Sequence, residues 1–466
     1  MNSISNMTSS SAFRINDTQF TCAIEELRKY VAIPSVSNPA SPDYSKDTLE
    51  KAAKFANTRL KDLAFEVTKC RVEDSAPFII AQKIVDVSKP TILLYAHYDV
   101  QPVEPSQWIS PPFIMEERQG RLYGRGASDD KGGIIAILTV LKAYKENNQK
   151  LPVNVKILFE GEEEYGSTHI RKVLEKNAAA LQANALVILD GMNQHAKTGT
   201  LSMSTRGLVS LSVEVKALKK PVHSGLGCLV PDPAMGIATL IASLRNPKDI
   251  PGFMDDYRPL NAHERQKLKQ SSPSAESYRQ ENGVFKNAML RGDPEKSIFE
   301  RIAEEPSLSV LNLQSGRPGG GNSIQSSARC EIGIRTTTGQ DPNRIAKVVK
   351  DHLLSQSAAI GGLKIRVEQM EPGDRAWSSD ISKPYSTKYL NALKGIFPKT
   401  AVQPGPGTLP MLADFEAIFP ETEIILPGVL DPESSPHSHN ESQDKDLLRN
   451  SMDALISFFT EVGRAS

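Results

Sequence analysis

Leu93-Leu94-Tyr95-Ala96-His97-Tyr98-Asp99-Val100 is an apolar run that delivers a histidine and a carboxylate two residues apart. Unbroken apolar runs of this kind are typical of buried strands in parallel sheets. Ligands of such sheets gather beyond the carboxyl ends of the strands, where His97 and Asp99 would lie. Taken alone, the pair could equally be a core histidine beside a surface aspartate.

Four later segments also contain acidic or histidine residues in places typical of metal ligands. Each places a carboxylate or an imidazole after an apolar strand or in a glycine-rich loop, where metal ligands are usually built. The segments are 124–133 (GRGASDDKGG), 159–167 (FEGEEEYGS), 186–191 (LVILDG) and 436–441 (PHSHNE). This recurrence favours a functional centre over a set of unrelated surface features.

Length and charge set the class of protein. A chain of 466 residues is too long for one hydrophobic core and predicts two domains. With 39% hydrophobic and 24% charged residues, the composition is that of an ordinary soluble protein. Basic and acidic side chains balance at 55 each, so nothing favours nucleic acid or an anionic membrane surface as a partner.

The N-terminal segment and the cysteines predict a cytoplasmic protein. Residues 1–17 are polar and lack the basic and apolar regions of a secretory signal. No apolar run approaches the ~20 residues needed to cross a bilayer. Cys22, Cys70, Cys228 and Cys330 are widely spaced, which predicts buried free thiols of a reducing compartment.

The alternation of helices and strands predicts an α/β fold with an insertion. Unbroken apolar strands alternating with helices indicate a mixed, largely parallel sheet covered by helices, and alternating strands after Gly207 indicate a smaller α+β domain. We expect the catalytic domain to comprise 1–206 and 377–466, and the inserted domain 207–376. Helices are predicted at 24–31, 48–63, 133–144, 234–244, 341–355 and 444–462, with a polar, helical stretch at 255–305. Strands are predicted at 78–81, 92–96, 153–159, 185–189, 209–215, 328–335, 364–369 and 424–426.

The five motifs, in this order, resemble the M20 family of metallopeptidases, which includes cytosolic dipeptidases, carboxypeptidases and N-acyl-amino-acid deacylases. The resemblance runs from about Glu25 to the C-terminus. It is closest to the carnosinase-like dipeptidase branch, judged by 95–102 (YAHYDVQP), by 128–132 (SDDKG) and by the long insertion between Arg206 and Trp377. It implies a zinc-peptidase-like catalytic domain with an inserted lid or dimerisation domain.

The resemblance also implies a centre of two divalent metal ions. His97 and Asp190 would hold one ion, Glu164 and His437 the other, and Asp129 would bridge them. Such a pair can polarise a carbonyl and generate a hydroxide nucleophile near neutral pH. Imidazole and carboxylate ligands suit zinc, and a carboxylate-rich site also admits manganese or cobalt.

Two of these assignments involve a choice between neighbours. The residues themselves do not decide whether Asp129 or Asp130 coordinates, and the family pattern of Asp, any residue, Lys-Gly favours Asp129. His437 and His439 compete for one position, and the family spacing His-x-x-Asn-Glu favours His437. The resemblance further implies a cis peptide bond between Asp129 and Asp130.

The glutamate run 162–164 holds the expected catalytic base. The family arrangement selects Glu163 as the general base that deprotonates a metal-bridging water and Glu164 as the ligand, which leaves Glu162 as a solvated neighbour. Asp99 would accept the second ring N–H of His97 and fix its tautomer. The alternative for Asp99 is a helix cap or a loop carboxylate.

Five residues of the later motifs are candidates for substrate contacts. In dimeric members of the family, the position of His223 enters the partner's active site and stabilises an oxyanion, which makes a homodimer a functional hypothesis. Arg335 could grip a substrate carboxylate through two parallel hydrogen bonds, or it could form a surface salt bridge. Asn322, in a Gly-Gly-Asn motif, matches a polar substrate contact, and Gly407 and Thr408 resemble a loop that binds the same carboxylate.

These features predict a two-metal hydrolase that cleaves dipeptides or other short peptides with a free C-terminal carboxylate. An N-acyl-amino-acid deacylase, such as succinyl-diaminopimelate desuccinylase, is the alternative within the same chemistry, although that branch commonly has Asp-Met-Lys-Gly at 129–132. A non-catalytic binding protein on a peptidase fold is the alternative of another class. It is disfavoured because every expected position carries a competent side chain.

Overall fold

The computed structural model describes residues 12–316 and 321–464. Residues 1–11 of the polar N-terminal segment, and Gly320 of the Gly-Gly-Asn motif, lie outside the described residues. The chain forms two compact units. The first unit comprises Met1–Met203, Ser379–Gln403 and Asp414–Ser466, and the second comprises Ser204–Ser378 and Pro404–Ala413.

The first unit is built on a mixed sheet. Its strands follow the order β1 (Glu66–Cys70), β2 (Phe78–Lys83), β6 (Asn154–Glu160), β3 (Thr91–His97), β7 (Ala185–Ile188), β18 (Glu423–Leu430) and β9 (Thr198–Thr205). The central strands β6, β3, β7 and β18 run parallel, while β1, β2 and β9 pair antiparallel. The expected α/β class with a mixed sheet is confirmed.

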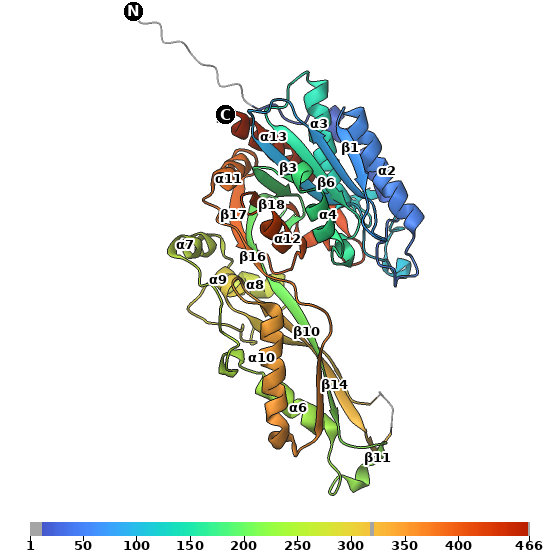
Figure 1. The fold of residues 1–466 in the computed structure, drawn as a ribbon, viewed down its shortest axis with the longest axis vertical. Helices are drawn as coiled ribbons and strands as arrows, with labels where there is room; N and C mark the ends of the chain where they lie inside the picture. Colours follow the sequence, from blue (N-terminus) through green and yellow to red (C-terminus); the bar gives the residue numbers. More distant parts are fainter. Residues whose placement is uncertain (1–11, 317–320, 465–466) are drawn as a thin grey trace, which may run out of the picture. The chain divides into compact units, whose positions relative to one another are not determined.

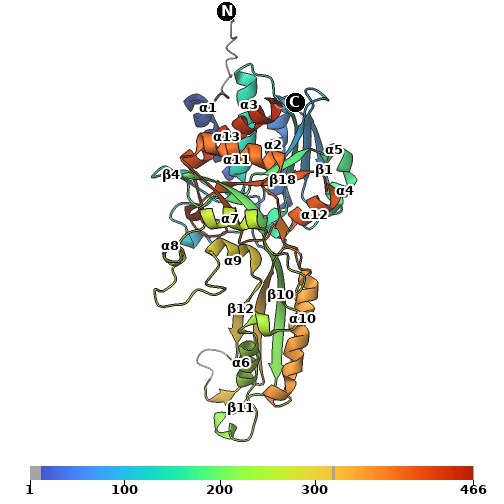
Figure 2. The same ribbon diagram turned by 90° about the vertical axis from the view of Figure 1, so that its left-hand side faces the viewer.

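Helices cover both faces of this sheet (Figures 1 and 2). One face carries α1 (Asp17–Val31), α2 (Lys46–Asp62), α3 (Lys131–Glu146), α11 (Pro384–Ile396) and α13 (Lys445–Arg464), and the other carries α4 (Ile170–Lys176), α5 (Ala178–Leu181) and α12 (Met411–Ile418). Helix α3 is apolar around most of its circumference and packs against β3, α1 and α13. The helix begins at Lys131, so Asp129 and Asp130 lie immediately before its first turn.

Shorter elements complete the first unit and its borders. A small antiparallel sheet follows the order β19 (Ser442–Asp444), β5 (Arg121–Tyr123) and β4 (Glu116–Arg118). The remaining strands are β8 (Gly191–Met192), β16 (Trp377–Ser378) and β17 (Lys399–Pro404).

The second unit contains a four-stranded antiparallel sheet of order β12 (Ser307–Gln314), β14 (Ser327–Thr336), β10 (Gly207–Lys216) and β15 (Lys364–Gln369). Helices α6 (Pro233–Ser243) and α10 (Pro342–Ser355) pack on it around a buried apolar core. Asp232 caps α6 by accepting a hydrogen bond from Ala234 N at 2.8 Å, as the Asp-Pro sequence predicts. A separate two-stranded sheet joins β11 (Val222–His223) to β13 (Ser323–Ile324).

The polar stretch at 255–305 forms three short helices, α7 (Ala262–Ser271), α8 (Ala275–Glu281) and α9 (Ile298–Glu304). All four cysteines are free, as expected, but the expectation that all are buried is wrong for Cys22 and Cys228, which are exposed. Among the described residues, no helix is both long and apolar enough to cross a lipid bilayer.

Candidate metal centre

Parallel strand ends bring the predicted ligands together. His97 is the last residue of β3, Glu163 and Glu164 follow β6, and Asp190 follows β7. His437 lies in the loop after β18. Because these four strands are adjacent and parallel, their carboxyl ends meet at one edge of the sheet.

Within the described part of the chain, two groups of side chains are arranged to hold a metal ion. His97, Asp130 and Asp190 form the first group, and Asp129, Glu164 and His437 form the second. In each group, one ligand atom from every residue lies within 4.8 Å of the others.

Asp129, a member of the second group, also contacts His97 of the first group. Its Oδ1 is 3.0 Å from Nε2 of His97, and its Oδ2 is 3.2 Å from Nε2 of His437. His437 Nε2 is also 2.9 Å from Glu164 Oε2. The two oxygens of one carboxylate thus face a histidine from each group, which is the arrangement that a bridging ligand requires.

Asp99 connects His97 to the glutamates. Its Oδ1 lies 3.3 Å from Nδ1 of His97 and accepts a hydrogen bond from the backbone N of Glu163 at 3.2 Å. Its Oδ2 accepts one from the backbone N of Glu164 at 3.0 Å. The carboxylate therefore orients the imidazole and also fixes the turn that carries both glutamates.

Glu441 organises the glycine-rich loop before α3. Its fully buried carboxylate pairs with Arg125 Nη1 at 2.7 Å and accepts hydrogen bonds from the backbone N–H groups of Gly126, Ser128 and Asp129 at 2.9–3.0 Å. Arg125 Nη2 donates to the carbonyl of Ser438, one residue after His437. This network ties the loop of Asp129 to the loop of His437.

Burial and charge shift the ionisation of the cluster strongly. Burial, with the negative charges of Glu164 and Asp129, raises the pKa of Glu163 to about 8 against the opposing charge of His97. Burial and the charge of Asp129 likewise raise the pKa of Asp190 well above its usual range.

The pKa values of the two histidines are raised, which favours positive charge beside these carboxyl groups. Burial disfavours the charged form of His97, but its hydrogen bonds to Asp129 and Asp99 outweigh this effect and raise its pKa well above its usual value. Hydrogen bonds to Asp129 and Glu164 raise the pKa of His437 to about 11. The raised pKa values favour the protonated form of both histidines, whose positive charge lies where the carboxylates converge.

The donor set fits divalent cations. Imidazole and carboxylate groups are ligands for zinc and its neighbours, and cations would replace the histidine protons as the compensating charge. Oε1 of Glu164 is buried and has no hydrogen-bond partner in the described part of the chain, although Oε2 contacts His437 and Gln101. A ligand oxygen left free in this way is consistent with a cation site.

Several functional contacts were missed from the sequence. Asp130, set aside in favour of Asp129, is fully buried and groups with His97, whose backbone N donates to Asp130 Oδ2 at 3.1 Å. The peptide bond between Asp129 and Asp130 is cis, as expected. The description of Glu162 as solvated is wrong, because it is buried and contacts His169 Nδ1 at 2.9 Å and Ala76 N at 2.6 Å.

Three of the predicted substrate contacts gather in the second unit. Arg335 Nη1 donates to Thr408 Oγ1 at 2.7 Å, and Thr408 Oγ1 donates to the carbonyl of Arg206 at 2.7 Å. Gly407 O accepts from the backbone N of Arg206 at 2.8 Å. Burial, with the charge of Arg335, lowers the pKa of Arg206 to about 10.

His223 and Asn322 lie together elsewhere in the second unit. His223 pairs with Ser323 in the two-stranded sheet, and Ser224 N donates to Asn322 O at 2.9 Å. Gly225 N donates to Nδ1 of the exposed His223 at 3.1 Å. Because Nδ1 accepts this hydrogen bond, a tautomer with the ring proton on Nε2 fits the geometry.

Comparison with known proteins gives the class. The profile of Peptidase family M20/M25/M40 matches residues 93–461. The chain is 29% identical to a cysteinylglycine-S-conjugate dipeptidase of Corynebacterium striatum, over 92% of this chain and 93% of that protein.

Two solved structures share the fold over nearly the whole chain. The crystal structure of human carnosine dipeptidase 1 has a TM-score of 0.81 and 25% identity, and covers 96% of this chain and 97% of its own. An M20 family metallo-carboxypeptidase from Sulfolobus solfataricus has a TM-score of 0.80 and 26% identity. The match covers 96% of this chain and 100% of that chain. The chain belongs to the M20/M25/M40 peptidase family and is a metal-dependent peptidase.

Replacing Glu441 tests its positioning role. We expect Glu441→Ala to leave Arg125 as a buried unpaired charge and to destabilise the protein by about 3–5 kcal/mol. Loss of support for the Asp129 loop should also weaken metal affinity roughly 10–100-fold. Thermal unfolding and zinc titration measure the two effects. Glu433→Ala, at a side chain that is 81% exposed in a neighbouring segment, is the matched control. Unchanged zinc affinity in Glu441→Ala would contradict this role.

Proposed function

We propose that this protein is a two-metal hydrolase that cleaves the amide bond of dipeptides or short peptides bearing a free C-terminal carboxylate. The observation that carries the proposal is the position of Asp129, whose two oxygens face His97 and His437 from adjacent ligand groups. The names of the relatives support a dipeptide substrate, since both the bacterial relative and the human structure are dipeptidases.

The proposed cofactors are two divalent cations, with zinc favoured by the imidazole–carboxylate donor set and manganese or cobalt as alternatives. His97 and Asp190 would hold one cation, Glu164 and His437 the other, with Asp129 shared. When bound, such a pair polarises a carbonyl oxygen and makes water more acidic.

Glu163 is the proposed general base. Its carboxylate takes a proton from the attacking water as the new C–O bond forms, and returns that proton to the nitrogen as the C–N bond breaks. Its position supports the role, because Oε2 lies 3.9 Å from Nε2 of His97 and the side chain is only 12% exposed. Asp99 holds the backbone of Glu163, and so limits where the carboxylate can move.

Arg335 and Thr408 are proposed to bind the C-terminal carboxylate of the substrate. Thr408 accepts from Arg335 and donates to the carbonyl of Arg206, which fixes the orientation of both side chains. A guanidinium oriented in advance loses less conformational freedom when it grips a carboxylate. Gly407 is proposed to line the same subsite, and Asn322 to make a polar substrate contact.

We also propose a homodimer in which the partner subunit's His223 stabilises the oxyanion. Within one chain, Arg335 and Ser327 lie eight residues apart on β14, or roughly 27 Å at about 3.4 Å per residue. The sheet that holds His223 lies beyond the Ser327 end (Figure 1). His223 and Arg335 of one chain are therefore too far apart to contact the same small peptide.

The edge strand β12 supports association through the second unit. Within the described residues it pairs only with β14, and its side chains are exposed from Ser309 onward. Val310, Leu311 and Leu313 are 43%, 63% and 57% exposed. An unpaired apolar strand edge of this kind is suited to a second chain.

Substrate specificity and metal dependence test the hydrolase proposal together. We expect metal-loaded protein to hydrolyse members of a dipeptide panel and to be inactive on N-succinyl amino acids, because the bacterial relative and the human structure named above are dipeptidases. Chelation should abolish turnover, and zinc, manganese or cobalt should restore it. Product release followed by liquid chromatography measures both. Turnover of N-succinyl substrates alone would favour the deacylase, and turnover insensitive to chelation would contradict a metal-dependent reaction.

Matched substitutions in the glutamate run test the base. Glu163→Gln should retain the fold and bound metal but lose about 10²–10⁴-fold in turnover, because amide nitrogen cannot accept the proton. Glu162→Gln should keep near-normal turnover, since an amide oxygen can still accept from Ala76 N. Steady-state kinetics with metal analysis distinguishes the two, and near-normal turnover by metal-loaded Glu163→Gln refutes the assignment.

Mixing two inactive variants tests the contribution of His223 across the dimer. Half of the dimers in an equal mixture of Glu163→Gln and His223→Ala are mixed, and each contains one site with both residues intact. Activity should therefore recover to about a quarter of the wild-type value after subunit exchange. No recovery in a verified mixed dimer would show that His223 does not act in trans.

A further inference from the structure

The second unit contains a cavity of about 1120 Å³ that the proposed reaction does not use. It is bounded by the end of α6, by the loop that follows it, by α8 and α9, and by the start of β12. The volume is sufficient for a metabolite-sized molecule.

The cavity wall is strongly cationic. Two acidic side chains line it, Asp249 and Glu305, and Glu305 already contacts Lys296 at 3.7 Å. The basic side chains that line it are Arg206, Arg245, Lys248, Arg291 and Arg301. The excess of positive charge within one concave surface favours an anionic occupant.

Four of these basic groups form no direct ion pair within the described part of the chain. Among residues 12–316 and 321–464, no ion pair involves Arg245, Lys248, Arg291 or Arg301. Arg291 Nη1 donates to Leu308 O at 3.0 Å, and Arg301 Nε donates to Lys296 O at 3.0 Å. Backbone carbonyls thus orient two of the guanidinium groups without neutralising their charge.

Arg206 adds a buried donor to the same wall. Its side chain is 8% exposed, and Nη1 and Nη2 donate to Ile302 O and Glu305 O at 2.7 Å each. Its Nε is buried with no hydrogen-bond partner in the described residues. A buried donor left unpaired costs free energy unless a ligand or water satisfies it.

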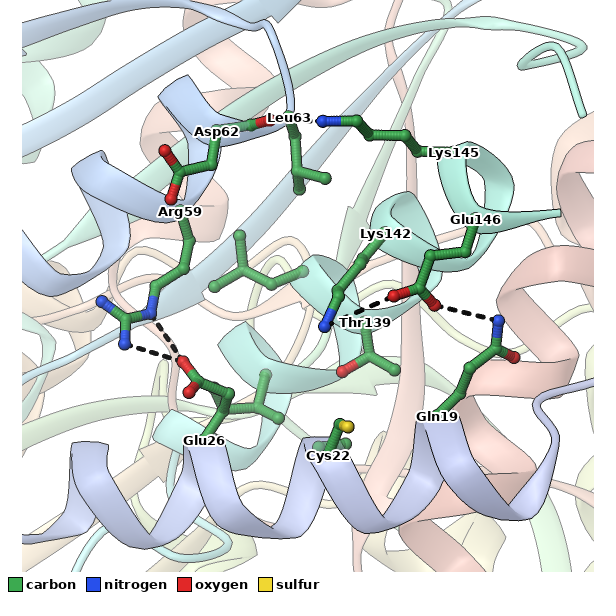
Figure 3. A pocket seen from close by; sticks show the side chains of 13 residues that line it. Gln19, Cys22, Glu26, Arg59, Asp62, Leu63, Thr139, Lys142, Lys145 and Glu146 are labelled. Carbon is green, nitrogen blue, oxygen red and sulfur yellow. Dashed lines mark hydrogen bonds and ion pairs between the residues drawn. The ribbon is translucent and has the colours of Figure 1, made fainter. Parts of the chain in front are cut away.

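The cavity between α1, α2 and α3 in the first unit provides a contrast (Figure 3). It measures about 640 Å³, and two of its basic groups, Arg59 and Lys142, pair with carboxylates. Glu26 contacts Arg59 at 2.7 Å, Lys142 contacts Glu146 at 3.4 Å, and Lys145 donates to Asp62 O at 2.8 Å (Figure 3). Polar and charged side chains thus line both cavities, but only the cavity of the second unit presents several basic groups without acidic partners.

We propose that the cavity of the second unit binds a small organic phosphate monoester. A phosphate ester carries nearly two negative charges at neutral pH and offers three oxygens, which suits several guanidinium groups better than a single carboxylate does. Met254, Tyr278, Val284 and Met289 line the same cavity and provide an apolar surface for the organic part of the ligand.

Calorimetric titration of the full-length, metal-loaded protein tests the proposal, with AMP and glucose 6-phosphate as probes and adenosine as the uncharged control. We expect saturable binding of at least one phosphate ester, no binding of adenosine, and weaker binding at higher salt. Arg245→Ala and Arg301→Ala should each weaken binding roughly tenfold or more, because each removes a charged hydrogen-bond donor. Arg366→Ala, at an exposed arginine that does not line the cavity, should leave affinity unchanged.

A metal-centre variant separates this site from the proposed reaction. A phosphate could also bind cations, so His437→Ala should retain probe binding if the cavity is the site. Binding that survives the double variant Arg245→Ala/Arg301→Ala, or that disappears in His437→Ala, overturns the proposal. Failure of both esters to bind at millimolar concentration also overturns it. None of these outcomes depends on peptide hydrolysis.

Discussion

The buried carboxylate of Glu441 is the contact on which the metal centre depends. It accepts backbone hydrogen bonds from the loop 126–129 and pairs with Arg125, which in turn holds the carbonyl of Ser438. The loop that carries Asp129 and the loop that carries His437, which are about 310 residues apart in the sequence, are thereby fixed to one another at the edge of the sheet. Without this connection, the parallel strands would still bring His97 and Asp190 together, but Asp129 and His437 would lack a defined separation.

The electrostatics of the centre follow from this enforced proximity. Burial alone disfavours every charged carboxylate, and several of them share a small volume with two histidines. Protons on His97 and His437 offset the negative charge when no cation is present. Cations of higher charge provide a stronger compensation and release those protons, so metal binding is expected to couple to both pH and folding. The strain of assembling like charges is thus the physical reason that the cluster prefers metal ions.

Much of the first unit could be predicted from the sequence because its signals are local. The apolar run before His97 predicts a buried strand, and the apolar positions of 133–144 predict a helix. Both predictions follow from the need to bury apolar side chains. The burial of Glu162 was not predicted, because the sequence around it gives no sign that His169 Nδ1 and Ala76 N are its partners. The roles of Glu441 and Arg206 were equally hidden, since their partners are backbone groups brought near by tertiary folding. The order of ligands came from a family pattern, and the physical chemistry of the residues did not choose between Asp129 and Asp130.

The sheet of the second unit favours the proposed dimer on two independent grounds. Strand β14 carries Arg335 near one end, and the β11–β13 sheet with His223 lies beyond the other, so a rigid strand separates the two groups that we propose act on one substrate. Bending cannot reduce this separation, because β10 pairs with β14 along its whole length. In the part of the chain that the structure describes, the same sheet leaves β12 unpaired on one side, and Leu311 and Leu313 of this strand are exposed. A second chain would cover this edge and could supply the histidine that we propose stabilises the oxyanion, so one association would account for both the exposed apolar surface and the proposed role of His223.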